Sequence, residues 1–472
     1  MTKADWDVIV IGAGTAGMPL AIFAAARGAR VLVIEHNDHL GGQLHWSSGQ
    51  LSAAGTRLHA AQGISDSPEQ HLADAIRISR GTVDTEAIRV VIDNAADTLH
   101  WLLDLGYEVH ADHPIVYFAH EPYSVPRTFF GPDKAVGIFR AMLPLYQAEE
   151  RAGRIQTRLS TDVIGWVADE KGAVAGVRYR DAQGVEGSAS ARNIVLATGG
   201  FARHAERFKA WTGYPLYSWC SEHSQGTGHL LGLEAGGVLK HGDKYLCTFA
   251  GIQNPKDPAQ YNVLTHLTPQ LRQPWELYVN FNGERFMRED DPSVDSREHA
   301  LQEQPEMSFW AIYDAGIVDA AKTPFFFGLT PAEIEVLWNT HDSFKRAASI
   351  AQLAHACQLP EAALTRTLAA YNQAVEHKHD AAFGREHLPH RIDTGPLYAV
   401  LHRGLSVVGW AGLDTDSQLR VLRADGSPIP NLYAVGEVRG FGLMNGNAFI
   451  GGMGLQPALT MGRLLGQRML QW

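Results

Sequence analysis

The sequence predicts an α/β protein with a parallel sheet, built from two chain segments that flank an inserted domain. Asp7–Ile11 is an apolar run that ends at glycines, a pattern typical of a buried parallel strand. The same pattern returns near the other end of the chain, at Asn431–Val435. Between them, the stretch from Cys247 to Gly409 is rich in proline, aromatic and charged residues. A chain of 472 residues is also too long for one core.

The expected elements follow in chain order. A helix after the first strand carries Pro19 in its first turn, where the missing N–H has no helical partner. Turns at Gly172 and Gly184 separate alternating strands and predict a three-stranded meander. The expected strands are 30–35, 163–167, 174–179, 186–191 and 193–198, and the expected helices are 16–27, 68–106, 349–357, 361–377 and 457–470. The predicted domains are 1–245 and 409–472 for the sheet domain and 246–408 for an α+β cap.

Composition and charge exclude several classes of protein. A net charge of −11 repels phosphate backbones, so we expect no nucleic-acid partner. The cysteines Cys220, Cys247 and Cys357 lie far apart and form no disulfide, CxxC or haem-binding pattern. No apolar run is long enough to span a membrane, and no signal-peptide pattern precedes the first strand. We therefore expect a cytoplasmic protein, and we predict no metal site.

A glycine-rich loop between the first strand and the first helix predicts dinucleotide binding. Gly12, Gly14 and Gly17 form the pattern GxGxxG. The first glycine permits a tight turn, the second lets a pyrophosphate approach the helix N-terminus, and the third lets helix and strand pack closely. Glu35 ends the second strand, where it can accept hydrogen bonds from a ribose. Its charge disfavours the 2′-phosphate of NADP.

Further strand-end glycines favour FAD over NAD. Gly41-Gly42-Gln43 and Ser48-Gly49 follow the second strand. Ala197–Gly200 and Leu432–Glu437 end two later strands. Because these motifs are widely separated in the chain, we expect one long ligand that crosses several loops.

At this point the chain resembles the fumarate reductase / succinate dehydrogenase flavoprotein family, and is closest in style to FAD-dependent 3-ketosteroid dehydrogenases. The resemblance covers essentially the whole chain and rests on GAGTAG, GGQLHWSSG, ATGGF, YVNFNGERFMRE, LDTDSQLRVLRADGSPIPNLYAVGE and GGMGLQPALTMGRLLG. It implies a Rossmann-like FAD-binding domain with a mobile cap over the active site. The residues that it and the loops assign to the cofactor are Gly12, Gly14, Ala16, Gly17, Glu35, Gly41, Gly42, Gln43, Ser48, Gly49, Val163, Ala197, Thr198, Gly199, Thr227, Gly228, Gly436, Glu437, Gly452, Met453 and Leu455.

Two loops bear on how the flavin is held. The Gly452–Leu455 loop opens the last helix, whose positive end would favour the anionic reduced flavin. Some relatives attach FAD covalently to a histidine, and His45 and Trp46 lie in the loop that should pass the flavin. Because the spacing to Gly49 differs here, we expect noncovalent FAD; the alternative role of His45 is structural.

The chain departs from the family at the substrate. Ser293, Val408 and Phe449 fall where fumarate reductases place arginine, histidine and arginine, so a dicarboxylate loses its strongest partners. Arg272 alone matches a family active-site arginine. Arg297 could replace one through a shifted loop, or be a solvated helix charge.

On the steroid-dehydrogenase side, Gly452 matches the glycine that grips the substrate carbonyl, whereas Ala448 stands at the tyrosine position. We expect a replacement in HEPYSVPR, where Tyr123 would act as the base, with its pKa lowered by Arg127. Tyr117 is the second candidate, and structural packing is the alternative for all three.

Aromatic residues predict a ring substrate. Trp410 and Phe449 would form an apolar wall, which suits a ring better than a small diacid. We expect a dehydrogenase that introduces a C=C bond next to the ketone of a ketosteroid or an oxocyclohexane-type compound. A single carboxylate on the ring would be paired by Arg272 or Arg127.

Two alternatives stay open: an ene-reductase of an activated alkene or unsaturated acid, and a flavoprotein subunit that serves only electron transfer or assembly. A quinone, another flavoprotein or oxygen would carry the electrons, because no haem or iron–sulfur motif is present. The sequence leaves the oligomeric state open.

Overall fold

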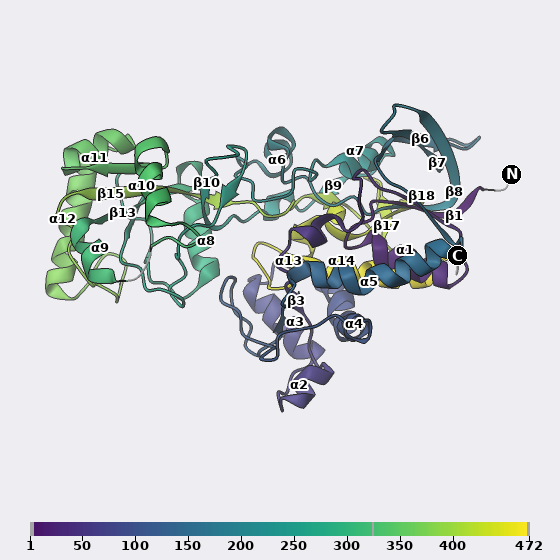
Figure 1. Ribbon diagram of the computed structural model, residues 1–472, viewed down its shortest axis with the longest axis horizontal. Helices are drawn as coiled ribbons and strands as arrows, with labels where there is room; N and C mark the ends of the chain where they lie inside the picture. The colour runs from purple at the N-terminus through teal and green to yellow at the C-terminus, as the bar shows by residue number, and fades with distance from the viewer. Residues whose placement is uncertain (1–3, 323–324, 470–472) are drawn as a thin grey trace.

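The computed structural model describes residues 4–322 and 325–469, which form two lobes (Figure 1). One lobe holds a parallel sheet and the other an antiparallel one. The sheet has the order β17-β18-β8-β1-β2-β5; the strands from β18 to β5 pair in parallel, and β17 is an antiparallel edge strand. Its strands are β1 (Trp6–Ile11), β2 (Val31–Ile34), β5 (Ile155–Arg158), β8 (Glu186–Leu196), β17 (Arg420–Leu422) and β18 (Pro428–Ala434). This confirms the predicted α/β fold class.

The predicted meander is also present and is attached to the sheet. β6 (Thr161–Ala168) and β7 (Val174–Asp181) pair antiparallel, and β7 pairs antiparallel with β8. The strand β8 is continuous, so the prediction of two strands at 186–191 and 193–198 is wrong. The first half of β8 pairs with β7 of the meander, and its second half lies between β1 and β18. One long strand therefore belongs to both parts of the sheet.

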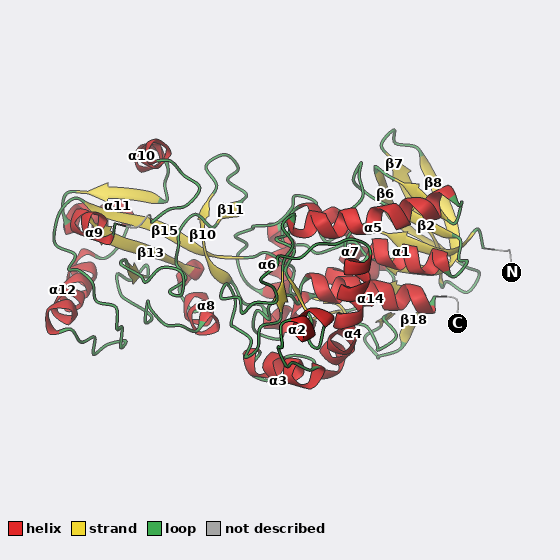
Figure 2. Ribbon diagram, turned by 60° about the horizontal axis from the view of Figure 1, so that its bottom comes forward, coloured by secondary structure: helices red, strands yellow, loops and turns green. Residues whose placement is uncertain are grey.

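Helices cover one side of the parallel sheet, with α1 (Gly17–Ala26), α5 (Lys134–Arg151) and α14 (Leu455–Arg468) lying side by side (Figure 2). Glycines let α14 approach α1 closely. A Cβ atom on Gly466 would come within 2.5 Å of the carbonyl oxygen of Leu20, and one on Gly462 would collide with that of Ala16. The last helix of the chain therefore packs directly on the helix that follows GxGxxG. It ends at Arg468; residue 470, the predicted end, lies outside the described residues.

The predicted helix over 68–106 is two helices, α3 (Pro68–Ile78) and α4 (Thr85–Asp104). The break occurs because Asp84 caps α4, accepting hydrogen bonds from the N–H groups of Glu86 and Ala87. The remaining elements of this lobe are β3 (Leu51–Ser52), β4 (Thr128–Phe129), β9 (Leu239–Lys240), β16 (Gly412–Leu413), α2 (Arg57–Ala61), α6 (Ala205–Thr212), α7 (Thr227–Glu234), α13 (Phe441–Asn445) and the 3-10 turns η1 (Gly42–His45), η2 (Gly242–Lys244) and η4 (Gly436–Arg439).

The second lobe is built on an antiparallel sheet of order β11-β10-β15-β13-β12, with β14 also paired to β15. Helices cover it, so it is the α+β arrangement expected of the cap. Its elements are β10 (Thr248–Gln253), β11 (Tyr261–Asn262), β12 (Leu277–Val279), β13 (Ser308–Asp314), β14 (Phe344–Ala347), β15 (Leu397–Leu405), α8 (Val294–Gln302), η3 (Pro305–Met307), α9 (Ala315–Ala321), α10 (Pro331–Thr340), α11 (Ile350–Cys357) and α12 (Glu361–His377). The domain boundaries stay a prediction.

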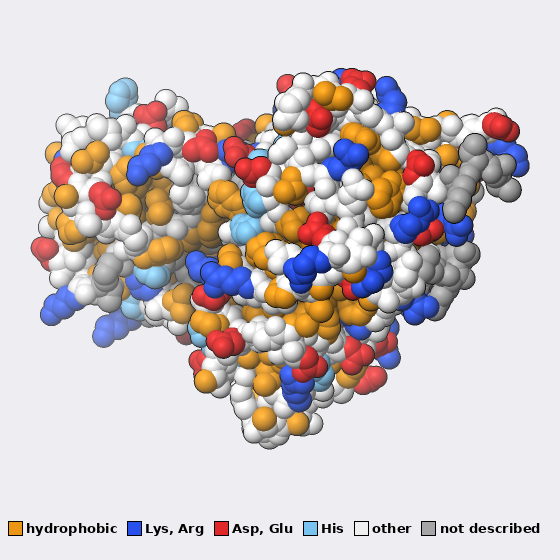
Figure 3. Space-filling view, turned by 45° about the vertical axis from the view of Figure 1, so that its right-hand side comes forward, with side chains coloured by type: hydrophobic (Ala, Val, Ile, Leu, Met, Phe, Trp, Pro, Cys, Tyr) orange, Lys and Arg blue, Asp and Glu red, His pale blue; other side chains and the backbone are white. Residues whose placement is uncertain are grey.

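The surface gives two general observations. On the face seen in Figure 3, lysine and arginine side chains alternate with acidic and apolar ones and form no continuous basic surface. Within residues 4–322 and 325–469, none of the helices combines the length and the apolar composition needed to cross a membrane.

Candidate active site

The glycine-rich loop after β1 has the geometry of a phosphate cradle. Gly12 has φ +99°, and a Cβ atom there would lie 2.5 Å from the carbonyl oxygen of Ala197. A Cβ on Gly17 would collide with the carbonyl oxygen of Gly12. A Cβ on Gly14, by contrast, would meet nothing nearer than the carbonyl oxygen of Gly41, at 3.8 Å. The first and third glycines therefore serve the fold, and the second borders open space at the start of α1.

Glu35 lies directly after β2 and is turned onto this loop. Its carboxylate accepts hydrogen bonds from the N–H groups of Ala13, at 2.6 Å, and Asn37, at 2.9 Å. Each carboxylate oxygen keeps a further lone pair. The residue is therefore fixed where it can also accept hydrogen bonds from a ribose.

The predicted contacts from more distant segments come together around the same space. Thr198 Oγ1 is buried and has no hydrogen-bond partner among the described residues. A Cβ on Gly228, in the first turn of α7, would collide with the Thr198 side chain. Gly199 has φ +72° and open space beside its Cα. An orphaned hydroxyl beside a glycine-lined space fits a bound cofactor, since buried polar atoms are normally satisfied.

His45 is occupied by contacts within the protein. Its Nε2 lies 2.8 Å from the carbonyl oxygen of Leu40, and its ring packs on Phe139 with the centroids 4.8 Å apart. These contacts give the ring a structural role without a flavin bond. Noncovalent attachment stays a prediction, and we expect acid or heat to release all of the FAD. Yellow chromophore retained on the denatured chain after gel filtration would contradict it.

Glu437 is a half-buried residue of the predicted flavin site. It lies at η4, accepts a hydrogen bond from the N–H of Gly409 at 2.6 Å, and requires Gly200, where a Cβ would collide with it. Burial raises its pKa to about 7. The carboxyl is therefore protonated in the folded chain at pH values where it is ionised in the unfolded chain.

This shift predicts a pH dependence of stability. Because the pKa of this carboxyl is raised, the fold loses stability progressively as pH rises from its ordinary pKa of 4.5 to about 7. For the FAD-free chain we expect Glu437→Gln to remove up to about 3 kcal/mol of that loss, because the amide keeps an acceptor for Gly409 N–H and does not ionise. Urea unfolding at pH 5 and pH 8 measures it. If the unfolding free energy falls equally between pH 5 and pH 8 in the natural and Glu437→Gln chains, the raised pKa of Glu437 is contradicted.

The Gly452 loop leads into α14 and is held against β3. Gly452 has φ +78°, and a Cβ there would lie 2.5 Å from the N atom of Ser52. The N–H of Met453 bonds to the carbonyl of Ile450 at 3.1 Å, whereas the N–H of Gly452 has no partner among the described residues. Gly452 is therefore a free donor at the start of the last helix.

The segment that carries the predicted catalytic residues runs along this loop. Glu121 forms a parallel bridge with Ile450, and the Tyr123 hydroxyl donates a hydrogen bond to the carbonyl of Gly451 at 2.5 Å. The hydroxyl also lies 3.4 Å from Ser52 Oγ. The prediction offered this segment as the replacement for the missing tyrosine, and the structure brings it to the loop that leads into the last helix.

The pKa of the Tyr123 hydroxyl is not lowered overall, because burial raises it well above its ordinary value. Arg127 lowers this pKa, as predicted, but by less than burial raises it. The guanidinium of Arg127 lies 4.7 Å from the Tyr123 ring centroid and is ion-paired with both Asp66 and Asp74, each at 2.6 Å. These two carboxylates raise the pKa of the phenol and so oppose the effect of the arginine. The contacts make Tyr123 a positioning residue for the Gly451 backbone.

His120 was missed as a candidate, and its ring contacts the predicted substrate wall. Its ring stacks on Phe449 with centroids 4.9 Å apart and planes 8° apart. Its Nδ1 is buried and unpartnered within the described chain, and burial lowers its pKa to about 4. Tyr117 packs edge-on to His120 and to Phe130, and burial raises its pKa. A neutral imidazole therefore lies at the wall. The sequence places His120 in the HEPYSVPR segment, but it does not show towards which residues the ring is turned.

The predicted aromatic wall is assembled from two segments. Phe449 lies 5.5 Å from Trp410 and 5.0 Å from Phe441, measured between ring centroids. Trp410 is fully buried, and its Nε1 has no partner among the described residues. The wall is therefore apolar, with Val408 beside it.

Arg272 is engaged within the cap. It forms an ion pair with Glu276, donates its Nε to the carbonyl of His266 at 3.1 Å, and lies 4.9 Å from the ring centroid of Phe325. Ser293 caps α8 and donates its hydroxyl to Glu121 at 2.9 Å. Arg272 and Ser293 both align with active-site positions of fumarate reductases. Ser293 contacts the HEPYSVPR segment, whereas Arg272 contacts residues of the cap.

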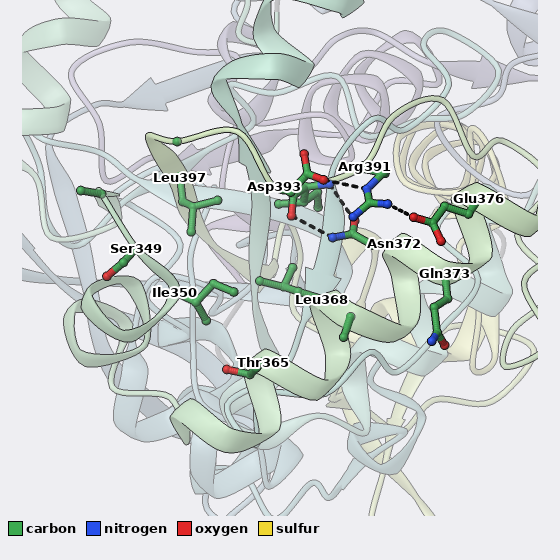
Figure 4. A pocket seen from close by; sticks show the side chains of 14 residues that line it. Ser349, Ile350, Thr365, Leu368, Asn372, Gln373, Glu376, Arg391, Asp393 and Leu397 are labelled. Atoms are coloured by element: carbon green, nitrogen blue, oxygen red, sulfur yellow. Dashed lines mark hydrogen bonds and ion pairs between the residues drawn. The ribbon is translucent and has the colours of Figure 1, made fainter.

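A cleft of about 490 Å³ lies in the cap, between α11, α12 and the strand β15 (Figure 4). Arg391, which borders it, is ion-paired with Glu376 and Asp393 (Figure 4). None of the residues that line the cleft belongs to the predicted site.

The chain is similar in sequence to known reductases and to a dehydrogenase. The chain is 28% identical over 470 residues to a fumarate reductase (cytochrome) of Shewanella frigidimarina, covering 98% of this chain and 76% of the relative. It is 27% identical over 462 residues to a vinyl phenol reductase of Lactiplantibacillus plantarum, covering 93% and 90%. It is 25% identical over 567 residues to a 3-oxosteroid 1-dehydrogenase of Mycobacterium tuberculosis, covering 98% of each.

The solved structure of 3-ketosteroid delta1-dehydrogenase from Sterolibacterium denitrificans has the same fold, with a TM-score of 0.76 at 19% identity over 98% of this chain and 99% of that one. The family model described as FAD binding domain matches residues 7–455. The predicted resemblance and the FAD cofactor are thereby confirmed, and the protein is an FAD-dependent oxidoreductase. The chain belongs to the FAD binding domain family, together with fumarate reductases and ketosteroid dehydrogenases.

Proposed function

We propose that the protein dehydrogenates a C–C bond next to the ketone of a ring compound. Two observations support this proposal: the aromatic wall of Phe449, Trp410 and Phe441, and the N–H of Gly452, three residues after Phe449, which has no partner among the described residues. Such a surface binds the faces of a ring and offers nothing to a small diacid. The 3-oxosteroid 1-dehydrogenase of Mycobacterium tuberculosis, a relative of the same family, supports a ketone substrate.

Each residue of the site would have its own role in the reaction. Bound FAD supplies the hydride acceptor at N5. The N–H of Gly452 holds the ketone oxygen and stabilises the enolate that forms there. His120 takes the α-proton, because its neutral imidazole can accept one. Tyr123 fixes the backbone of Gly451, and the aromatic wall excludes water.

The reverse chemistry is the second candidate. The fumarate reductase of Shewanella frigidimarina and the vinyl phenol reductase of Lactiplantibacillus plantarum favour reduction of an activated alkene. The same groups would then act in the reverse order, and His120 would have to be protonated first to give a proton to the α-carbon. In either direction we propose a diffusible electron carrier, namely a quinone, a flavoprotein or oxygen, and a cytoplasmic location.

The test is anaerobic reduction of the bound FAD by a panel of cyclic ketones, with product identification. Ring ketones should bleach the flavin absorbance and yield the conjugated enone. We expect dicarboxylates to be poor substrates, because Ser293, Val408 and Phe449 cannot pair with carboxylates. Fumarate reduction with a kcat/KM of about 10⁴ M⁻¹s⁻¹ or higher would sink the ring-ketone proposal.

A further inference from the structure

Arg297 is a buried cation that the protein leaves without a counter-ion. It lies on α8 with 2% of its surface exposed, and no carboxylate of the described residues lies within ion-pair distance. Other buried arginines have one: Arg127 with Asp66 and Asp74, Arg272 with Glu276, and Arg385 with Glu289.

Two more buried arginines, Arg439 and Arg463, also lack a carboxylate partner, but each gives its Nε to a threonine hydroxyl, at 2.9 and 3.2 Å. The Nε of Arg297 is buried and has no partner in the described chain. Among residues 4–322 and 325–469, its one hydrogen-bond acceptor is the carbonyl oxygen of Leu267, 2.7 Å from Nη1. Removing a guanidinium from water without hydrogen bonds or an opposite charge is costly, so a partner from outside the chain fits this site.

The position of α8 places Arg297 beside the site. Ser293 lies one turn before Arg297, on the same face of the helix, and bonds to Glu121 at 2.9 Å. Glu121 is the neighbour of His120 in the chain. Two residues after Arg297, on the same helix, His299 Nε2 lies 3.2 Å from the carbonyl oxygen of Asn447, in the loop that leads to Gly452. The helix therefore spans the gap between the cap and the flavin-side loop.

The wall opposite this arginine is aromatic. The guanidinium carbon of Arg297 lies 5.2 Å from the ring centroid of Phe249, at the start of β10. Phe249 is partly buried and packs against the hydrophobic cluster that contains Phe449. Arg272 and Arg127 were the predicted partners of a ring carboxylate, but both are already paired with carboxylates of the chain. Of these three arginines, Arg297 is the one without a carboxylate partner in the described part of the chain.

We propose that Arg297 binds a carboxylate carried by the ring substrate, so that the substrate class is a cyclic ketone with one acidic group. The inference rests on the proposed function for the ring and the ketone. The acidic group of the substrate is inferred from Arg297 alone. A guanidinium and a carboxylate form charge-assisted, often bidentate hydrogen bonds, and this geometry favours the acid over its ester.

The test compares 3- and 4-oxocyclohexanecarboxylate with their methyl esters. We expect the natural chain to show a KM about 10²-fold lower for one of the acids than for its ester, the usual effect of bonds to a charged group. Arg297→Met should abolish this preference and leave the KM of the ester within about 3-fold. Arg297→Lys keeps the charge and should retain part of the preference. An unchanged acid-to-ester ratio in Arg297→Met would overturn the inference.

A matched control and a non-reactive probe separate this inference from the proposed function. Arg346→Met removes an exposed cap arginine paired with Glu335 and should behave as the natural chain. Cyclohexanecarboxylate carries the acid without the ketone, and its binding is read from the flavin absorbance band. If no ketone reduces the FAD but this acid binds the natural chain and not Arg297→Met, the proposed function fails and the inference stands. If ketones react and the acid does not bind, the inference fails alone.

Discussion

A Gly14→Val chain is expected to fold normally and to purify without FAD. The valine methyls would occupy the open space beside the loop, where the nearest protein atom to a Cβ is the carbonyl oxygen of Gly41, 3.8 Å away. Because the protein itself leaves this room, the substitution blocks the pyrophosphate and leaves the fold intact. We expect FAD affinity to fall at least about 10²-fold, which corresponds to about 3 kcal/mol.

The measurement is the ratio of flavin absorbance to protein absorbance after purification, together with the circular dichroism of the chain. Gly17→Val is the matched comparison. Its Cβ would collide with the carbonyl oxygen of Gly12, so this variant should lose the fold as well as the cofactor. A Gly14→Val protein that stays yellow would show that the pyrophosphate lies elsewhere.

His120→Phe is expected to lower the rate of flavin reduction by substrate about 10²–10⁴-fold, the usual contribution of a positioned acid–base group. Phenylalanine keeps the ring that stacks on Phe449 and removes both nitrogens. FAD content should be unchanged, because the side chain packs on the substrate wall. In the natural chain the rate should decline only as pH falls towards about 4, since protonation of His120 removes the base.

Tyr123→Phe separates this role from the earlier prediction. A tyrosine base would show the same 10²–10⁴-fold loss when its hydroxyl is removed. The hydroxyl is instead bonded to the Gly451 carbonyl and lies near Ser52, and its pKa is raised by burial, so we expect a loss of about 10-fold or less. Stopped-flow reduction of both variants by one ring ketone decides it. A greater loss in Tyr123→Phe than in His120→Phe would return the base to Tyr123.

The fold was predictable because its signals are local. Apolar runs that end at glycines mark β1 and β18, and Gly172 and Gly184 mark the turns of the meander. The break between α3 and α4 was not predicted, because Asp84 lies within an amphipathic stretch that reads as one continuous helix. The single strand β8 was missed because its two halves have different partners, which only the assembled sheet reveals.

The site was predictable only in part, since its chemistry depends on which charges meet in space. The sequence placed Tyr123 and Arg127 four residues apart, but it could not show that Asp66 and Asp74 neutralise the arginine. Arg297 looked like an ordinary helix charge, and its lack of a counter-ion becomes visible only once α8 is buried. His120 gains its interest from stacking on Phe449, a residue more than three hundred positions later.

The chain enters and leaves the proposed cap at neighbouring points. β10 and β15 pair antiparallel with Thr248 opposite Leu405, and the next residue, Ser406, bonds through its backbone to Tyr217 and Trp219, at 2.8 and 2.9 Å. An inserted segment with adjacent ends can be exchanged as a cassette, because the host domain needs only a short join to close. Gene recombination at these two points would thus alter which molecules a descendant enzyme accepts, while its flavin chemistry passes on unchanged.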